Sequence, residues 1–223
     1  MLNFRPSFVV LAVAFGVMAI TTSIQAGDTK ASANYKKNKI LQPGRTIVDC
    51  VPSTYFNGIN DQRVLKNELL AQATEFTVEA IIYPLNAFKT SPQPRFLHLE
   101  SPTDPSHRLT MELRITDNRT WYFDTFISSP KGELVLIDSS KTHPVDQWHH
   151  IAISYKKRRL TSYIDYSVEL QGDTAFKPFT EPQWVSVGAR LNQVYWFNGY
   201  IHRIEVTPKA LSSRDFKLSI PHC

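Results

Sequence analysis

The sequence predicts an all-β protein that folds as a sandwich of two antiparallel sheets. Apolar and polar residues alternate at the two-residue period of half-buried strands, as in 76–83 and 148–155. Strand-like stretches recur at short intervals, and the prolines fall between them, where a missing amide donor does no harm. The predicted strands are 46–51, 62–66, 75–83, 95–100, 108–116, 120–128, 133–138, 148–156, 160–170, 184–190 and 199–207.

The N-terminus is typical of a secretory signal peptide over residues 1–26. Arg5 precedes an apolar run over 8–20, and small residues lead to Ala26. The run is shorter than the roughly 20 apolar residues that span a bilayer, so an uncleaved membrane anchor is the less favoured alternative. We therefore expect a secreted or periplasmic protein with no membrane span once the signal is removed.

One folded domain is expected behind a polar leader. Residues 27–45 are polar and basic without an apolar period, which predicts a flexible leader. The domain then covers 46–223, a length at which an all-β sandwich forms a sizeable core. The chain of 223 residues has a formal net charge of +5, an excess that favours anionic partners through long-range attraction.

The two cysteines, Cys50 and Cys223, stand at the two ends of this domain. An even pair in a secreted protein predicts a disulfide between them, with two free thiols as the weaker alternative. By the chain-entropy argument, closing so long a loop stabilises the fold by about 5 kcal/mol at most.

The alternation also assigns faces and irregularities. Every second residue from Phe76 to Ile82 is apolar and is predicted to face the core, while the residues between them line an outer face. The alternation slips within 201–206, which predicts a bulge. Residues 211–216 predict one short helical turn capped by a serine hydroxyl.

Four pieces of the chain together resemble one family of domains. They are Phe76-Thr77-Val78-Glu79-Ala80, Trp148-His149-His150-Ile151-Ala152, Leu160-Thr161-Ser162-Tyr163-Ile164-Asp165, and Gly199-Tyr200-Ile201 with Ala210-Leu211-Ser212. The set resembles the strands of laminin-G-like, concanavalin-A-like lectin and glucanase domains over roughly residues 46–217. The resemblance implies a jelly-roll sandwich of a family that mostly binds glycans or proteins and often carries calcium.

Two departures from the family pattern bear on calcium. Tyr166 stands where the family usually has glycine after its turn aspartate, and His202 stands where it usually has aspartate. Calcium takes roughly six to eight hard oxygens, whereas acids such as Asp117, Asp124 and Asp165 are scattered along the sequence. Calcium is therefore implied by the resemblance alone, and no metal ligand is predicted.

No catalytic residue is predicted. Glycoside hydrolases on this fold present two carboxylates on one strand, one as nucleophile and one as general acid. The nearest match, from Glu112 to Asp117, has Arg114 at its middle acidic position. A plain strand also places residues an odd number apart on opposite faces. The favoured interpretation is a non-catalytic module, with a polysaccharide-cleaving enzyme of divergent site as the alternative.

A glycan site needs exposed aromatic rings beside amide or guanidinium groups. Segment 190–198 has this mixture in a connection between two strands. Its candidate ligand-binding residues are Arg190, Asn192, Tyr195, Trp196 and Asn198. The alternative is that Trp196 and Phe197 pack as core, as large aromatics usually do. Trp121 is a further candidate with the same alternative, since adjacent strand residues such as Trp121 and Tyr122 face opposite ways.

Lys156, Lys157, Arg158 and Arg159 are predicted to form a basic turn between two strands. Four adjacent cations are a candidate site for sulfated or uronic polysaccharide or for lipid phosphate, and a solvated turn is the alternative. No aromatic residue that could stack on bases is interleaved with them, so no nucleic-acid partner is expected.

Together these observations predict a secreted, non-catalytic module that binds carbohydrate through loop aromatics. Its basic residues favour an anionic polysaccharide. Besides the enzyme, the other alternative to this module is a protein–protein interaction domain with an extracellular partner.

Overall fold

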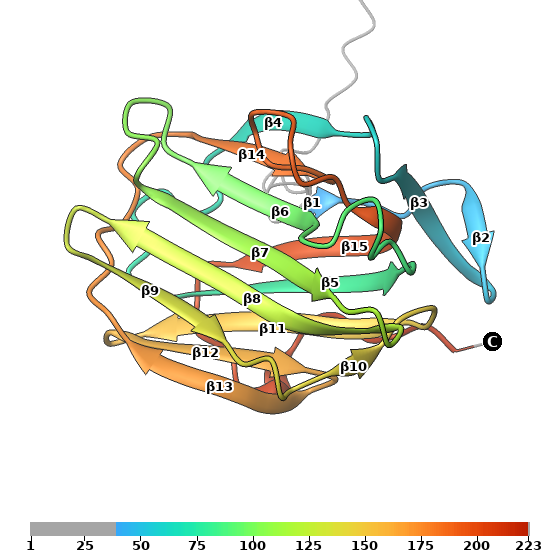
Figure 1. The fold of residues 1–223 in the computed structure, drawn as a ribbon. Coiled ribbons are helices and arrows are strands. Elements are labelled where there is room, and N and C mark those ends of the chain that lie inside the picture. The colour runs from blue at the N-terminus through green and yellow to red at the C-terminus, as the bar shows by residue number, and fades with distance from the viewer. Residues whose placement is uncertain (1–38, 223) are drawn as a thin grey trace, which may run out of the picture.

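The computed structural model describes residues 39–222 and confirms an all-β fold of two packed antiparallel sheets (Figure 1). The strands are β1 (Lys39–Leu41), β2 (Thr46–Val48), β3 (Val51–Asn57), β4 (Arg63–Asn67), β5 (Phe76–Pro84), β6 (Arg95–Glu100), β7 (Arg108–Ile115), β8 (Thr120–Ser129), β9 (Gly132–Ile137), β10 (His143–Pro144), β11 (His149–Lys156), β12 (Arg159–Ile164), β13 (Ser167–Asp173), β14 (Gln183–Val187) and β15 (Asn198–Thr207). A 3-10 turn, η1, covers Ser213–Asp215.

The strands form two sheets with the connections of a jelly roll. Sheet I has the order β13-β12-β11-β5-β15-β3-β2, and β1 also pairs with β15. Sheet II has the order β10-β8-β7-β6-β14-β4, and β9 also pairs with β8. Because β3, β5 and β15 belong to sheet I while β4, β6 and β14 belong to sheet II, the chain crosses repeatedly between the two layers.

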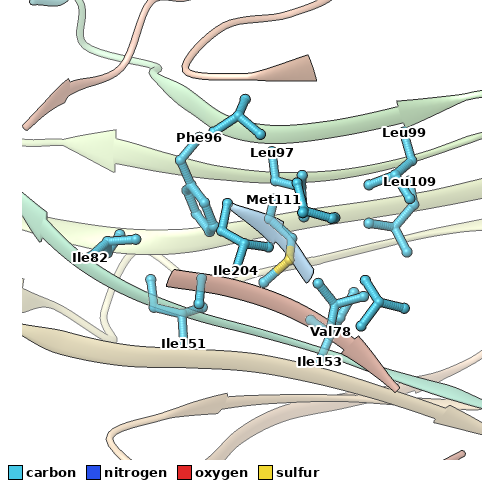
Figure 2. Packing of buried hydrophobic residues seen from close by; sticks show 14 of the residues in the cluster. Val78, Ile82, Phe96, Leu97, Leu99, Leu109, Met111, Ile151, Ile153 and Ile204 are labelled. Carbon is cyan, nitrogen blue, oxygen red and sulfur yellow. The ribbon is translucent and has the colours of Figure 1, made fainter. Parts of the chain in front are cut away.

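The hydrophobic core lies between the sheets. Figure 2 shows Val78 and Ile153 of sheet I near Leu99 and Met111 of sheet II, and all of these side chains are fully buried. The predicted inward set of β5 is confirmed, since every second residue from Phe76 onward belongs to the buried core. Complete burial of a Val, Leu, Ile, Phe or Met side chain stabilises a fold by about 1.5–3 kcal/mol.

The folded region begins earlier than the predicted boundary at residue 46. Lys39–Leu41, part of the predicted leader, forms β1 beside β15, and Ile40 and Leu41 are buried. An apolar pair in a polar stretch is too short for its period to indicate a strand. Burial against the sandwich decides its structure.

The predicted strand 160–170 is a hairpin. Strands β12 and β13 are joined at Asp165 and Tyr166, whose φ angles are +47° and +68°. Two successive left-handed residues are typical of a tight hairpin turn, which glycine and asparagine usually occupy. The predicted strand 46–51 likewise divides into β2 and β3.

The C-terminal segment, residues 208–222, contacts the outer face of sheet I. The buried Glu79 side chain accepts hydrogen bonds from the amides of Lys217 (2.9 Å) and Leu218 (2.8 Å). Thr77 Oγ1 accepts one from the amide of Leu211 (2.8 Å). Thr77 and Glu79 were predicted to line an outer face, and they do, but this segment buries them.

Two local predictions have different outcomes. The predicted bulge is confirmed, because the pairing of β15 with β5 shifts register between Ile201 and Arg203. The predicted helical turn is η1, but its serine cap is wrong. The hydroxyl of Ser212 lies 2.7 Å from the Asp215 carboxylate and makes no capping bond to the backbone.

The predicted disulfide stays a prediction. Cys50 is exposed in the turn between β2 and β3, whereas Cys223 and the predicted signal peptide over 1–26 lie outside the described residues. In the view of Figure 1, the last described residues and this turn lie toward the same side of the molecule. None of the helical structure within 39–222 is long and apolar enough to cross a membrane.

Candidate functional site

The outer face of sheet II carries a cluster of charged side chains. Alternation along β7 turns Leu109, Met111 and Leu113 into the core, so that Arg108, Thr110, Glu112 and Arg114 point outward. Neighbouring strands add charges in the same rows. We call the following side chains the charged face: Lys66, Arg95, His98, Glu100, Arg108, Glu112, Arg114 and Asp124.

Two carboxylates and two guanidinium groups interlock on this face. Glu112 and Asp124 are cross-strand partners on β7 and β8. Arg114 donates to Asp124 Oδ2 (2.8 Å) and to Glu112 Oε1 (3.2 Å), while Arg95 pairs with Glu112 from the other side. Burial raises the pKa of Glu112, and the Arg95 guanidinium opposes that shift. These four charges therefore largely neutralise one another.

His98 is neutral and offers an unused acceptor. Burial lowers its pKa to about 3, and the positive charges of Arg95 and Arg190 act in the same direction. Its Nε2 lies 2.9 Å from the Glu100 carboxylate, which accepts, so the single ring proton sits on Nε2. The buried Nδ1 is then a bare acceptor with no partner among the described residues, and Thr110 Oγ1 opposite it is also unpartnered.

Near His98, the guanidinium groups of Arg108 and Arg190 make no salt bridge to a carboxylate within residues 39–222. Arg108 donates to the Pro105 carbonyl (3.0 Å). Burial lowers the pKa of Arg108, and the charges of Arg190 and Arg95 lower it further, whereas Glu100 and Glu133 oppose the shift. The three cations outnumber the two carboxylates, so this arrangement favours an anion.

Aromatic rings accompany the cations. The Arg95 guanidinium lies 5.0 Å from the Tyr195 ring centroid, Arg108 lies 4.9 Å from that of Phe126, and Lys66 Nζ lies 4.5 Å from that of Trp184. Such contacts hold a cation in place while leaving its donors available. A depression of about 280 Å³ is lined by Arg95, Arg108, Glu112, Arg114, Asp124, Phe126, Val135 and Ile137.

Residues 190–196 of the predicted segment 190–198 form a loop that borders the charged face. The amide of Arg95 donates to the Tyr195 carbonyl (2.8 Å), which fixes the loop beside β6. Tyr195 is 42% exposed, Asn192 is exposed and Trp196 is half-buried. A second depression, of about 340 Å³, is lined by Glu100, Pro105, Arg190, Leu191 and Asn192. The loop and sheet II thus form one surface.

Two of the predicted ligand-binding residues lie elsewhere. Trp121 is fully buried and donates through Nε1 to the Pro144 carbonyl (3.0 Å), so its prediction as a ligand-binding residue is wrong. Trp121 lies on the inward face of β8 and so belongs to the core. The two-residue alternation could not predict which member of the adjacent pair Trp121 and Tyr122 faces inward. Asn198 begins β15 of sheet I and bonds through its carbonyl to the amide of Leu85, away from the charged face.

The predicted basic turn lies on sheet I, at the connection of β11 and β12. Lys156 pairs with Glu75 (3.0 Å), and Arg159 pairs with Asp173 (2.6 Å). Lys157 and Arg158 occupy the two left-handed positions of the turn and are exposed. Two of the four cations are therefore already neutralised, and the turn is separate from the charged face.

The turn aspartate does not fit calcium. Both carboxylate oxygens of Asp165 are engaged, Oδ2 with His149 Nδ1 (2.9 Å) and Oδ1 with the amide of His150 (2.9 Å). His202 makes its bond to the Pro52 carbonyl (2.6 Å) and supplies no carboxylate. Within residues 39–222, no group of three or more His, Cys, Asp or Glu side chains could hold a metal ion.

Sequence reasoning missed the charged face as a site. Glu112 and Arg114 are two residues apart and so share a face of their strand, but their partners Arg95 and Asp124 come from other strands. Only register brings them together. The sequence did contain one indication of this face. Polar residues alternate with apolar ones along 108–114, which predicts that they share the outer face of the strand.

Comparison with known proteins agrees with this architecture. A sequence profile described as the concanavalin A-like lectin/glucanases superfamily matches residues 57–216. No curated protein matches the chain.

Several solved structures share the fold at low sequence identity. A pentraxin of Limulus polyphemus, described as SAP-like, superposes with a TM-score of 0.56 at 12% identity, covering 71% of this chain and 76% of its own. The CBM40 of a Ruminococcus gnavus IT-sialidase, bound to alpha2,3 sialyllactose, gives 0.54 at 15%, covering 73% and 95%. Domains LG4-5 of mouse laminin alpha1 give 0.51 at 16%, covering 78% of this chain but 48% of the laminin structure.

These likenesses show a shared fold, and the profile match spans most of the described residues. The chain belongs to the concanavalin A-like lectin/glucanases superfamily.

Proposed function

We propose that this protein is a non-catalytic module that binds an anionic carbohydrate, outside the cytoplasm, on the charged face and the adjoining loop 190–196. The observation that carries the proposal is the pair Arg108 and Arg190. Their guanidinium groups make no salt bridge to a carboxylate within the described chain and lie close together, with Glu100 beside both.

The chemistry of the face matches the parts of an acidic sugar. Guanidinium groups bind carboxylate or sulfate oxygens through charge-assisted hydrogen bonds. Sugar hydroxyls can bond the side-chain amide of Asn192, which is exposed in the adjoining loop. The exposed ring of Tyr195 offers a surface for the C–H face of a pyranose.

The structural neighbours support a binding role. One neighbour is bound to alpha2,3 sialyllactose, a sugar that carries a carboxylate, and belongs to a carbohydrate-binding module. The predicted signal peptide over 1–26 supports export, which would bring the module to extracellular or periplasmic polysaccharide.

One observation favours the alternative of a polysaccharide-cleaving enzyme. Glu112 and Asp124 are adjacent carboxyl groups, and burial raises the pKa of Glu112, as in a general acid. Arg95 and Arg114 occupy both carboxylates, however, so neither faces a free substrate position. Binding without cleavage is the better-supported function.

The test is a glycan array with protein lacking residues 1–26, carrying sialylated, uronic, sulfated and neutral glycans. We expect signal on acidic glycans that weakens as salt rises, because screening acts on charged contacts. Arg108→Ala should weaken binding about tenfold or more, the effect of losing one charge-assisted contact. Lys157→Ala also removes one positive charge, but from the exposed turn of sheet I, so it should leave binding unchanged.

A reducing-sugar assay on the glycans that bind separates the two functions. New reducing ends that disappear in Glu112→Gln would establish the enzyme and overturn the non-catalytic proposal. Silence on the array with retention of a protein partner in a pull-down would instead support a protein-interaction domain.

A further inference from the structure

A second aromatic surface lies on the outer face of sheet I. Strand register places Tyr55 of β3, Tyr200 of β15 and Tyr83 of β5 side by side across three adjacent strands. Trp148, just before β11, packs against Tyr83, and His202 lies beyond Tyr200 on β15. We call these five side chains the tyrosine row.

The rings of the tyrosine row hold one another in place. Tyr55 and Tyr200 have ring centroids 5.0 Å apart, and Tyr83 stands nearly perpendicular to Tyr200 at 84° and to Trp148 at 73°. Edge-to-face contacts of this kind restrict ring motion and leave the exposed faces preformed. Tyr55 is 42% exposed and the other rings are half-buried, so the row is open to solvent.

The polar groups beside the row suit hydroxyls rather than an anion. His202 Nδ1 lies 2.6 Å from the Pro52 carbonyl, which accepts, and burial lowers the His202 pKa, so the ring is neutral and Nε2 is a free acceptor. Arg203, next along β15, is half-buried, and its Nε does not reach the solvent. The acceptor of His202 is therefore the polar group that the row offers to a ligand.

The charges around the row differ from those of the charged face. The negative charges of Asp49 and Asp146 act on the Tyr83 phenol, whose pKa is raised chiefly by burial. Asp146 also pairs with Arg119, and the charges that act on Tyr83 are negative, in contrast to the cations that surround Arg108.

We propose that the tyrosine row is a second carbohydrate-binding surface, and that its ligand is a neutral polysaccharide. Two strand spacings of about 4.8 Å each put roughly 10 Å between the outer tyrosines, a span suited to a short stretch of sugar chain. Pyranose C–H faces would pack on the rings, while a hydroxyl would donate to His202 Nε2. The negative charges near Tyr83 disfavour an acidic chain and so favour a neutral one.

Native affinity electrophoresis of protein lacking residues 1–26 tests this inference. The gels contain mixed-linkage β-glucan, galactomannan or dextran as neutral probes, and polygalacturonate or heparin as acidic probes. We expect retardation by at least one neutral polymer, and we expect Tyr55→Ala to weaken it about tenfold, the scale of losing one packed aromatic at an interface. Tyr55→Phe, which keeps the ring, should retain most of the binding.

Tyr195→Ala is the matched control, because Tyr195 is 42% exposed like Tyr55 but borders the charged face. It should leave retardation by the neutral polymer unchanged. Arg108→Ala should likewise weaken only the retardation by acidic probes. The proposals for the charged face and for the tyrosine row are therefore tested separately.

Retardation by none of the neutral polymers overturns the inference, as does equal retardation of Tyr55→Ala and the unchanged protein. Size-exclusion chromatography addresses another occupant. A concentration-dependent dimer that Tyr55→Ala abolishes would assign the row to self-association, and the carbohydrate proposal would then be wrong.

Discussion

The ring of Tyr166 stacks on the ring of His150, with centroids 4.5 Å apart and planes 12° apart. Phe216 of the C-terminal segment covers the same histidine at 5.0 Å, and the amide of Ile220 donates to the Tyr166 hydroxyl (3.0 Å). Tyr166 therefore joins the β12–β13 turn to the C-terminal segment. Its φ of +68° is unfavourable for a bulky residue, so these contacts must offset that strain.

Replacing Tyr166 by glycine, the usual residue of the family, should destabilise this protein despite relieving the backbone. Glycine removes about 1 kcal/mol of strain but loses a half-buried ring and its hydrogen bond. We expect a net loss of about 1–2 kcal/mol in the free energy of unfolding, measured by urea denaturation. Tyr166→Phe, which keeps the stack, should lose about 1 kcal/mol. A more stable glycine variant would show that the stack contributes little.

Glu79→Gln should loosen the C-terminal segment. The buried carboxylate accepts from the amides of Lys217 and Leu218, whereas an amide side chain places a donor against one of them. The expected loss is about 2–3 kcal/mol, since a buried donor is left unpaired. Limited proteolysis should cut the segment faster in Glu79→Gln than in the exposed control Glu133→Gln. Equal cleavage rates would contradict the anchoring role.

His98 should make stability depend on pH. Its pKa is about 3 in the folded protein and near 6.5 when unfolded, so between these values the unfolded chain binds the extra proton. The contribution of neutral His98 is present above pH 6.5 and is lost as pH falls toward 3, by at most about 1.4 kcal/mol per pH unit.

Urea denaturation of the protein and of His98→Gln at several pH values between 7.5 and 4 measures this effect. The variant should lose less stability on acidification. Parallel curves would mean that His98 becomes protonated without penalty. Half-buried Glu100 and buried Glu112, whose pKa values are raised, act in the opposite sense. The contribution of Glu112 is common to both proteins, whereas Glu100 loses its histidine partner in the variant.

Much of the fold could be predicted because period-two alternation reports burial directly. The inward residues of β5 and the bulge of β15 follow from it. Strand β1 and the burial of Glu79 could not be predicted in this way. Both depend on what packs over a residue from a distant part of the chain, and no local pattern records that contact.

The candidate site was predictable only in part. Exposed Tyr195 and Asn192 were identified, because a loop rich in aromatic and amide groups indicates a surface. The surrounding Arg108 and His98 were not, since they meet only through strand register and look like solvated residues in sequence. The same limit concealed the tyrosine row, whose members come from separate strands.

Trp121→Phe separates core packing from ligand binding. The buried indole donates to the Pro144 carbonyl and packs edge-on against His149 with ring centroids 5.0 Å apart. Phenylalanine leaves that carbonyl unpaired and a small cavity, so we expect a loss of about 1–3 kcal/mol in the free energy of unfolding. Binding to acidic glycans should not change below the unfolding transition, whereas Tyr195→Ala should weaken binding with little loss of stability. A Trp121→Phe protein that is fully stable but binds poorly would return this tryptophan to the ligand site.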